Sequence, residues 1–150
     1  MRILAVDWGE KRVGLAVSDE SGRFALPRGF ALRRSDREAI GKIVDLARQE
    51  GAETILLGLP LKMQGGEGDA AGRVRKLSTI LEKASGLPVV LRDERLTTQE
   101  ARERLRAAGV KPRDIPEKID ETAAVILLED YFSELSGKAK AHAAGPQSQD

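Results

Sequence analysis

The chain has 150 residues, of which 41% are hydrophobic and 33% are charged, and its formal net charge is +1. This length and composition predict one globular domain, and the small net charge excludes a strongly basic protein that coats nucleic acid. The absence of cysteine excludes disulfides, a thiolate nucleophile and cysteine-ligated zinc. No apolar run is long enough to cross a membrane and no signal-peptide pattern is present, so we expect a cytoplasmic protein without a membrane partner.

Hydrophobic periodicity, glycines and capping signals divide the chain into strands and helices. In chain order, these are strands over residues 3–7, 12–18 and 23–32, a helix between 35 and 51, a strand over 54–57, a helix over 69–84, a strand over 88–92, a helix between 97 and 109, and a last helix over 117–134. Pro27 predicts that the third strand is an edge strand or is bulged. Capping-box spacing, Ser35 with Glu38 and Thr97 with Glu100, begins two of the helices.

This order of elements predicts an α/β fold. We expect a mixed five-stranded sheet, in which an antiparallel meander of three strands continues into parallel strands, with helices on both faces. The folded domain is expected to span residues 1–135. Residues 136–150 are mostly small and polar and are predicted to form a disordered tail.

The first predicted hairpin places a carboxylate at the end of a core strand. Asp7 follows an apolar strand and enters a turn that contains Gly9, and a second apolar strand follows at once. Burying a charge there is costly unless it pairs with a metal ion, or with a phosphate held through one. The hairpin therefore indicates phosphate chemistry, the alternative being that Asp7 caps the turn. Trp8 is expected to pack in the core.

Further carboxylates follow the last predicted strand. Asp93 and Glu94 lie at its carboxyl end, and ligands of open α/β sheets gather outside the carboxyl ends of the strands. If this strand neighbours the first one, its terminal carboxylate converges with Asp7. Alternatively, the two acids begin the loop and cap the next helix. The residue pattern by itself does not choose between them.

A third carboxylate, Asp120, lies on the apolar face of the last predicted helix. It shares this face with Ala123, Ala124 and Leu127, and alanines let a helix approach a sheet closely. The alternative is an acid favoured by the helix dipole. Carboxylates from three elements form an oxygen-ligand site that suits Mg²⁺ or Mn²⁺, and a pair of such ions can clamp the attacking and leaving oxygens of a phosphodiester.

Basic residues and glycines accompany these acids. Lys11, Arg12 and Arg95 are suitable phosphate ligands or ordinary surface ion-pair partners, and a locally positive groove is compatible with overall neutrality. Gly58 begins a glycine-rich segment that contains Gly65. This segment is either a loop whose backbone approaches a phosphate or a structural turn, and it does not match the P-loop pattern.

Taken together, four motifs resemble the YqgF family, also called RuvX, over about residues 2–132. They are Asp7-x-Gly9-x-Lys11-Arg12-Val13-Gly14-Leu15-Ala16, Gly58-Leu59-Pro60 with Gly65, Glu67 and Gly68, Asp93-Glu94-Arg95-Leu96-Thr97-Thr98-x-Glu100-Ala101, and Asp120-x-x-Ala123-Ala124-x-x-Leu127. The first motif alone is shared with sugar kinases and actin-like ATPases. The four in this order are specific to the family.

The resemblance implies an RNase H-like fold and a nuclease that depends on Mg²⁺ or Mn²⁺, with catalytic and metal-binding acids at Asp7, Glu94 and Asp120. The implied substrate is the 5′ end of pre-16S rRNA, or else a Holliday junction, whose symmetric cleavage favours a homodimer. One rival is a two-domain nucleotide-binding ATPase, for which the chain is too short. Another is a non-catalytic RNA-binding factor for ribosome assembly.

Overall fold

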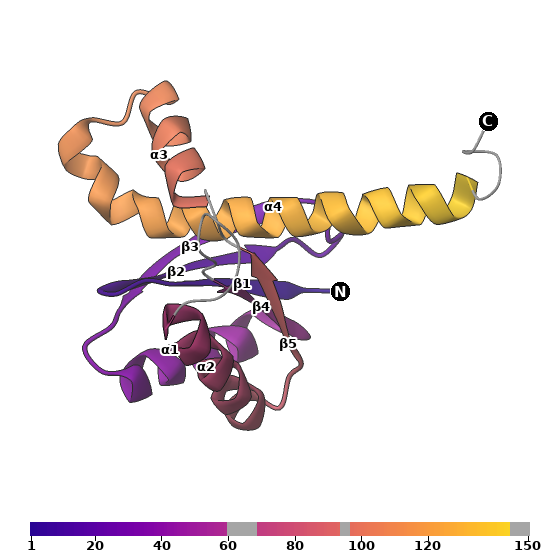
Figure 1. Ribbon diagram of the computed structural model, residues 1–150, viewed down its shortest axis with the longest axis horizontal. Coiled ribbons are helices and arrows are strands. Elements are labelled where there is room, and N and C mark those ends of the chain that lie inside the picture. The colour runs from indigo at the N-terminus through magenta and orange to yellow at the C-terminus, as the bar shows by residue number, and fades with distance from the viewer. Residues whose placement is uncertain (60–68, 94–96, 145–150) are drawn as a thin grey trace.

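The computed structural model describes residues 1–59, 69–93 and 97–144, with side chains at 1–58, 72–92 and 97–137 (Figure 1). In chain order the elements are β1 (Ile3–Trp8), β2 (Arg12–Ser18), β3 (Ala25–Leu32), α1 (Asp36–Glu50), β4 (Thr54–Leu59), α2 (Asp69–Ser85), β5 (Val89–Asp93), α3 (Thr97–Ala107), the 3₁₀ turn η1 (Pro112–Asp114) and α4 (Ile115–Ala144). The predicted order of strands and helices is confirmed, and η1 is the addition.

The sheet has five strands in the order β3-β2-β1-β4-β5. Strands β1, β2 and β3 pair antiparallel, whereas β4 pairs in parallel with both β1 and β5. The predicted mixed sheet is therefore confirmed. Strand β3 is an edge strand, and its register with β2 shifts between Gly14 and Ala16, which agrees with the prediction from Pro27.

Helices cover both faces of the sheet. Figure 1 shows α1 and α2 on one side and α4 across the other, with α3 standing on α4. Side chains of β1 alternate between the two faces: Leu4 and Val6 belong to the core under α1 and α2, whereas Ile3 and Ala5 belong to the core under α4. By the same alternation, Asp7 lies on the α4 face.

Helix α4 packs directly on the backbone of β2. A Cβ atom added to Gly14 would lie 1.9 Å from the carbonyl oxygen of Asp120, so only glycine permits this approach. Ala123 and Ala124 are buried beside it. The close approach predicted from the two alanines is confirmed, and Gly14 supplies the matching space on the sheet.

The last helix is longer than expected. Helix α4 continues to Ala144, so residues 136–144 are helical and do not form the irregular tail that their composition suggested. This segment contains lysines and alanines, which are strong helix formers, and it extends beyond the edge of the sheet (Figure 1). Residues 145–150 lie outside the described residues, and the domain boundary at 135 stays a prediction. In the described ranges, no helix combines the length and apolar character needed to span a membrane.

Candidate active site

Two of the three predicted acids meet where β1 ends. Asp7 is only 7% exposed and pairs across the hairpin with Gly14, the residue on which the backbone of Asp120 rests. A Cβ atom added to Gly9 would lie 3.2 Å from Asp120 Oδ1. A hydrogen bond of 3.1 Å from Gly9 N to the carbonyl oxygen of Arg12 closes the turn between β1 and β2. This turn therefore lies next to the Asp120 carboxylate.

The two carboxylates influence each other electrostatically. The pKa of Asp120 is raised from 3.8 to about 6, first by burial and then by the negative charge of Asp7, against the opposing effect of the Arg12 guanidinium. A partly buried acid whose ionisation is opposed by a neighbouring carboxylate is a setting in which a cation is favourable. Carboxylate oxygens are also the ligands that Mg²⁺ and Mn²⁺ prefer. The residues present therefore fit a divalent metal ion.

The third predicted ligand follows β5. Strands β1, β4 and β5 are parallel, so Asp93, the last residue of β5, and Asp7 lie at the same edge of the sheet with β4 between them. The side chain of Asp93, together with Glu94 and Arg95, lies outside the described residues. Within residues 1–59, 69–93 and 97–144, no group of three potential ligands gathers around one point.

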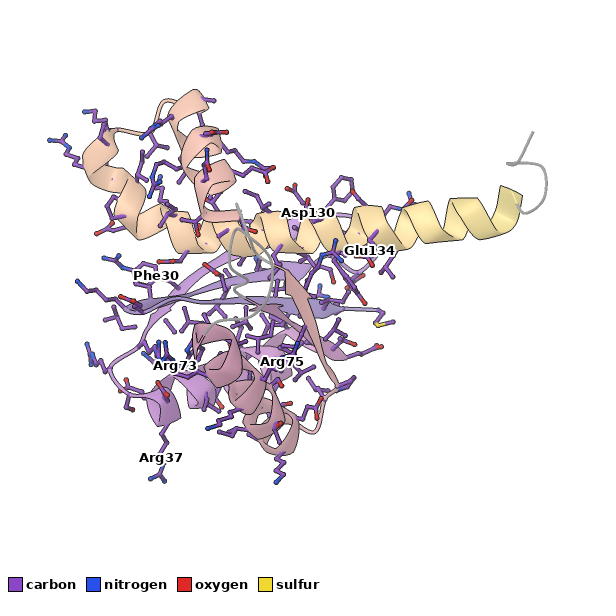
Figure 2. All side chains as sticks on the ribbon, viewed as in Figure 1. Phe30, Arg37, Arg73, Arg75, Asp130 and Glu134 are labelled. Atoms are coloured by element: carbon purple, nitrogen blue, oxygen red, sulfur yellow. The ribbon has the colours of Figure 1, made fainter. Side chains whose placement is uncertain are left out.

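Arg92 fixes the end of β5 against α4. Its guanidinium forms an ion pair with Glu134, donates from Nη2 to the carbonyl oxygen of Asp130 at 3.4 Å, and lies 5.8 Å from the centre of the Tyr131 ring. Figure 2 labels Asp130 and Glu134 on α4. The strand that leads to Glu94 is consequently tied to the helix that carries Asp120.

The predicted substrate-binding residues have different environments. Arg12 donates from Nη1 to the carbonyl oxygen of Pro116 at 3.1 Å, and its guanidinium lies 5.3 Å from the centre of the Phe30 ring. Lys11 is exposed at the turn, whereas Gly58 is buried inside β4 and does not begin a loop. Gly65 lies outside the described residues. The structure thus places Arg12 beside Asp120, and the role of Lys11 stays a prediction.

Sequence patterns did not single out Arg33. Its guanidinium covers the ring of Trp8 at 4.7 Å, donates from Nη1 to the carbonyl oxygen of Gly9 at 3.1 Å, and pairs through Nε with Asp36 at 2.9 Å. These contacts brace the turn that carries the acidic site. Trp8 is half-buried against the core, in agreement with its predicted packing role. No local motif marks Arg33, because Trp8 and Gly9 belong to a distant segment and only Asp36 is close to it in sequence.

Two pockets with basic side chains lie on opposite faces of the sheet, the first beside Asp120 and the second beside Trp8. The pocket on the α4 face has a volume of about 370 Å³ and is lined by Arg12, Arg102, Arg106, Pro112, Ile115, Pro116, Ile119 and Asp120. The pocket between α1 and α2 has a volume of about 250 Å³, and Arg33, Arg73 and Lys76 are its basic residues. Figure 2 shows Arg73 on α2. Basic side chains therefore lie beside Asp120 in the first pocket, and a positive groove around the acidic centre stays a prediction.

The raised pKa of Asp120 predicts how the stability of the metal-free protein depends on pH. The folded chain binds this proton more tightly than the unfolded chain does, so stability is lost as the pH rises from 3.8 through about 6. Because the carboxyl group is only partly buried, we expect a loss of about 1–2 kcal/mol in the free energy of unfolding. Thermal unfolding in the presence of EDTA, from about pH 4 to about pH 8, measures this loss of stability. As the pH rises over this range, the Tm of Asp120→Asn should increase relative to the Tm of the parent. A difference in Tm that does not change with pH would contradict the prediction.

Comparison of the sequence with known proteins identifies a matching family and similar relatives. The family model described as "RuvX: Holliday junction resolvase" matches residues 1–134. A protein of Syntrophus aciditrophicus named "Putative pre-16S rRNA nuclease" is 41% identical over 136 residues, which cover 91% of both chains. A protein of Thermus thermophilus with the same name is 43% identical over 133 residues, which cover 89% of this chain and 98% of the relative.

Solved structures share the fold at low sequence identity. T. thermophilus RuvC in complex with a Holliday junction substrate gives a TM-score of 0.55 at 16% identity, covering 91% of this chain and 96% of the other. The fowlpox virus resolvase in complex with Holliday junction DNA gives 0.57 at 12%, covering 90% and 99%. These similarities confirm the RNase H-like fold. The family model over residues 1–134 and the relatives at 41% and 43% identity show that the chain belongs to the RuvX family.

Proposed function

We propose that this chain is a metal-dependent nuclease that hydrolyses phosphodiester bonds during 5′-end processing of pre-16S rRNA. The observation that carries the proposal is the meeting of Asp7 and Asp120, which come from β1 and α4, where the charge of Asp7 contributes to raising the pKa of Asp120. Membership of a family of nucleases, and relatives of nearly equal length named for pre-16S rRNA, support the reaction and the substrate. A cytoplasmic location is part of this proposal.

Asp7 and Asp120 would hold the metal ion together with Glu94. The family resemblance favours Glu94 over Asp93. Within β5, Val90 packs in the core under α4 and Arg92 reaches α4, so the strand that leads to these acids is joined to the helix that carries Asp120. When bound, Mg²⁺ or Mn²⁺ supplies Lewis acidity for the attacking water and for the phosphoryl oxygens.

The chain's own cations hold the substrate phosphate. Arg12 keeps its guanidinium beside the acids through Pro116 and Phe30, so its positive charge is fixed before the substrate arrives. A preorganised cation stabilises negative charge that develops on phosphoryl oxygens. Lys11 at the exposed turn, and Arg95 after β5, are the further phosphate ligands in this proposal.

A Holliday junction resolvase is the second candidate. The description of the matching family model favours it. Since a junction is cut at two matching strands, this function requires a symmetric pair of active sites, and we therefore expect a homodimer in that case. Measurement of the solution mass checks the homodimer.

A side-by-side cleavage assay tests the proposal. The purified chain is incubated with an end-labelled RNA that spans the 5′ leader and mature end of 16S rRNA, and with a labelled four-way DNA junction, in EDTA, Mg²⁺ or Mn²⁺. We expect metal-dependent cleavage of the RNA at a defined position. Symmetric nicks in the junction alone would support the second candidate. RNA binding without cleavage in either metal would contradict both and identify a non-catalytic assembly factor.

A further inference from the structure

Three arginines converge on the pocket of the α4 face, beside the acidic site. Arg12 comes from β2, whereas Arg102 and Arg106 come from α3, which stands on α4 in Figure 1. Asp120 is the one acid that lines this pocket in the part of the chain that the structure describes. A pocket with three guanidinium groups and one carboxylate is positively charged, and it therefore attracts an anion.

The arginines of α3 differ in their partners. Arg102 and Arg106 are four residues apart and share one face of the helix, and neither side chain has an ion pair or hydrogen bond within the described ranges. Arg104 lies between them in sequence and pairs with Glu100 at 3.8 Å and Glu129 at 2.7 Å. The two α3 arginines that line the pocket are thus the ones that have no ion-pair partner among the described residues.

Arg12 contributes a donor that lacks an acceptor. Its Nε is buried and has no hydrogen-bond partner among the described residues, although Nη1 donates to Pro116. Leaving a buried donor unsatisfied is unfavourable, and the oxygens of a bound anion would satisfy it. The planar fork of a guanidinium matches phosphate geometry.

From this arrangement we propose that Arg102 and Arg106 bind a backbone phosphate of the nucleic-acid strand adjacent to the bond that is cleaved, with Arg12 shared between this phosphate and the one at the acids. The proposal rests on the nuclease function above, and it adds a second phosphate subsite to the one at the metal. Because Asp120 lines the same pocket, a phosphate held there lies on the strand that enters the acidic site. The apolar side chains of Ile115 and Ile119 offer a surface for the sugar that follows.

Single substitutions on α3 test this subsite against a matched control. Arg102→Ala, Arg106→Ala and Arg104→Ala each remove one positive charge from the same helix, and each is made in the full chain with Asp7→Asn to prevent cleavage. Binding of a fluorescent RNA of the 16S leader is measured by anisotropy over a range of salt concentrations. We expect Arg102→Ala and Arg106→Ala to weaken binding about tenfold and to reduce the salt slope by about 1, and Arg104→Ala to change the Kd less than about twofold.

The outcomes separate this subsite from the nuclease proposal, because binding is measured without cleavage. Equal losses in all three variants would show general electrostatic attraction and overturn the subsite, as would no loss in any of them. Orthophosphate provides the last comparison. If it raises the Tm of the parent while RNA affinity is the same in every variant, the pocket holds a free anion and the proposal is overturned. Thermal unfolding of each variant verifies that it is folded.

Discussion

Asp7→Asn is expected to abolish phosphodiester cleavage while the chain remains folded. Asparagine keeps the shape of the side chain but removes the charge that a metal ion requires, so the rate should fall on the order of a thousandfold or more. Asp7 is buried and its charge opposes the ionisation of Asp120, so the loss of that charge does not remove a stabilising attraction between the two acids. Single-turnover cleavage of the 16S leader RNA and thermal unfolding measure the two effects.

The same substitution at an exposed acid provides the control. Asp45→Asn changes the same functional group in α1, where the side chain is exposed, and should leave both cleavage and Tm unchanged. In the Asp7→Asn variant, the pKa of Asp120 should fall toward 3.8 because one cause of its elevation is gone. Parental activity in Asp7→Asn would refute the assignment of Asp7 as a catalytic residue.

The strands of the sheet were predicted well from the sequence because the signals that mark them lie within each strand or at its ends. Buried strands such as residues 54–57 are continuous apolar runs, and Ser35 forms the expected helix N-cap, since its Oγ accepts from Glu38 N at 3.1 Å. Local signals of this kind also position Asp7 at a strand end and Asp120 on an apolar helix face. Their meeting was predictable once β1 and α4 were recognised as layers of one fold.

What the sequence did not reveal depends on partners from distant segments. Arg33 contacts Trp8 and Gly9, which belong to a distant segment, in addition to Asp36 three residues away. Periodicity does not encode the distant contacts. Whether an arginine of α3 forms an ion pair depends on α4, because Arg104 pairs with Glu129 of that helix. The length of α4 was underestimated because small, polar residues resemble a tail in composition, although lysine and alanine favour a helix. Glu94 owes its assignment to family resemblance.

Gly14→Ala is expected to damage both stability and activity. The added Cβ would lie 1.9 Å from the carbonyl oxygen and 2.2 Å from the carbonyl carbon of Asp120. Both contacts are with backbone, so no side-chain rotation relieves them, and α4 must move away from β2. We expect the free energy of unfolding to fall by about 3 kcal/mol. Cleavage should also be lost, because the movement carries the Asp120 carboxylate away from Asp7.

Gly41→Ala separates this effect from glycine replacement in general. Gly41 lies inside α1, and a Cβ atom there meets nothing within 4 Å, so alanine should stabilise the helix by up to about 1 kcal/mol and leave cleavage unchanged. Chemical denaturation and single-turnover cleavage are measured for both variants. A Gly14→Ala protein with parental stability would show that α4 does not rest on β2. Parental cleavage in a destabilised Gly14→Ala protein would instead show that Asp120 acts without a fixed distance to Asp7.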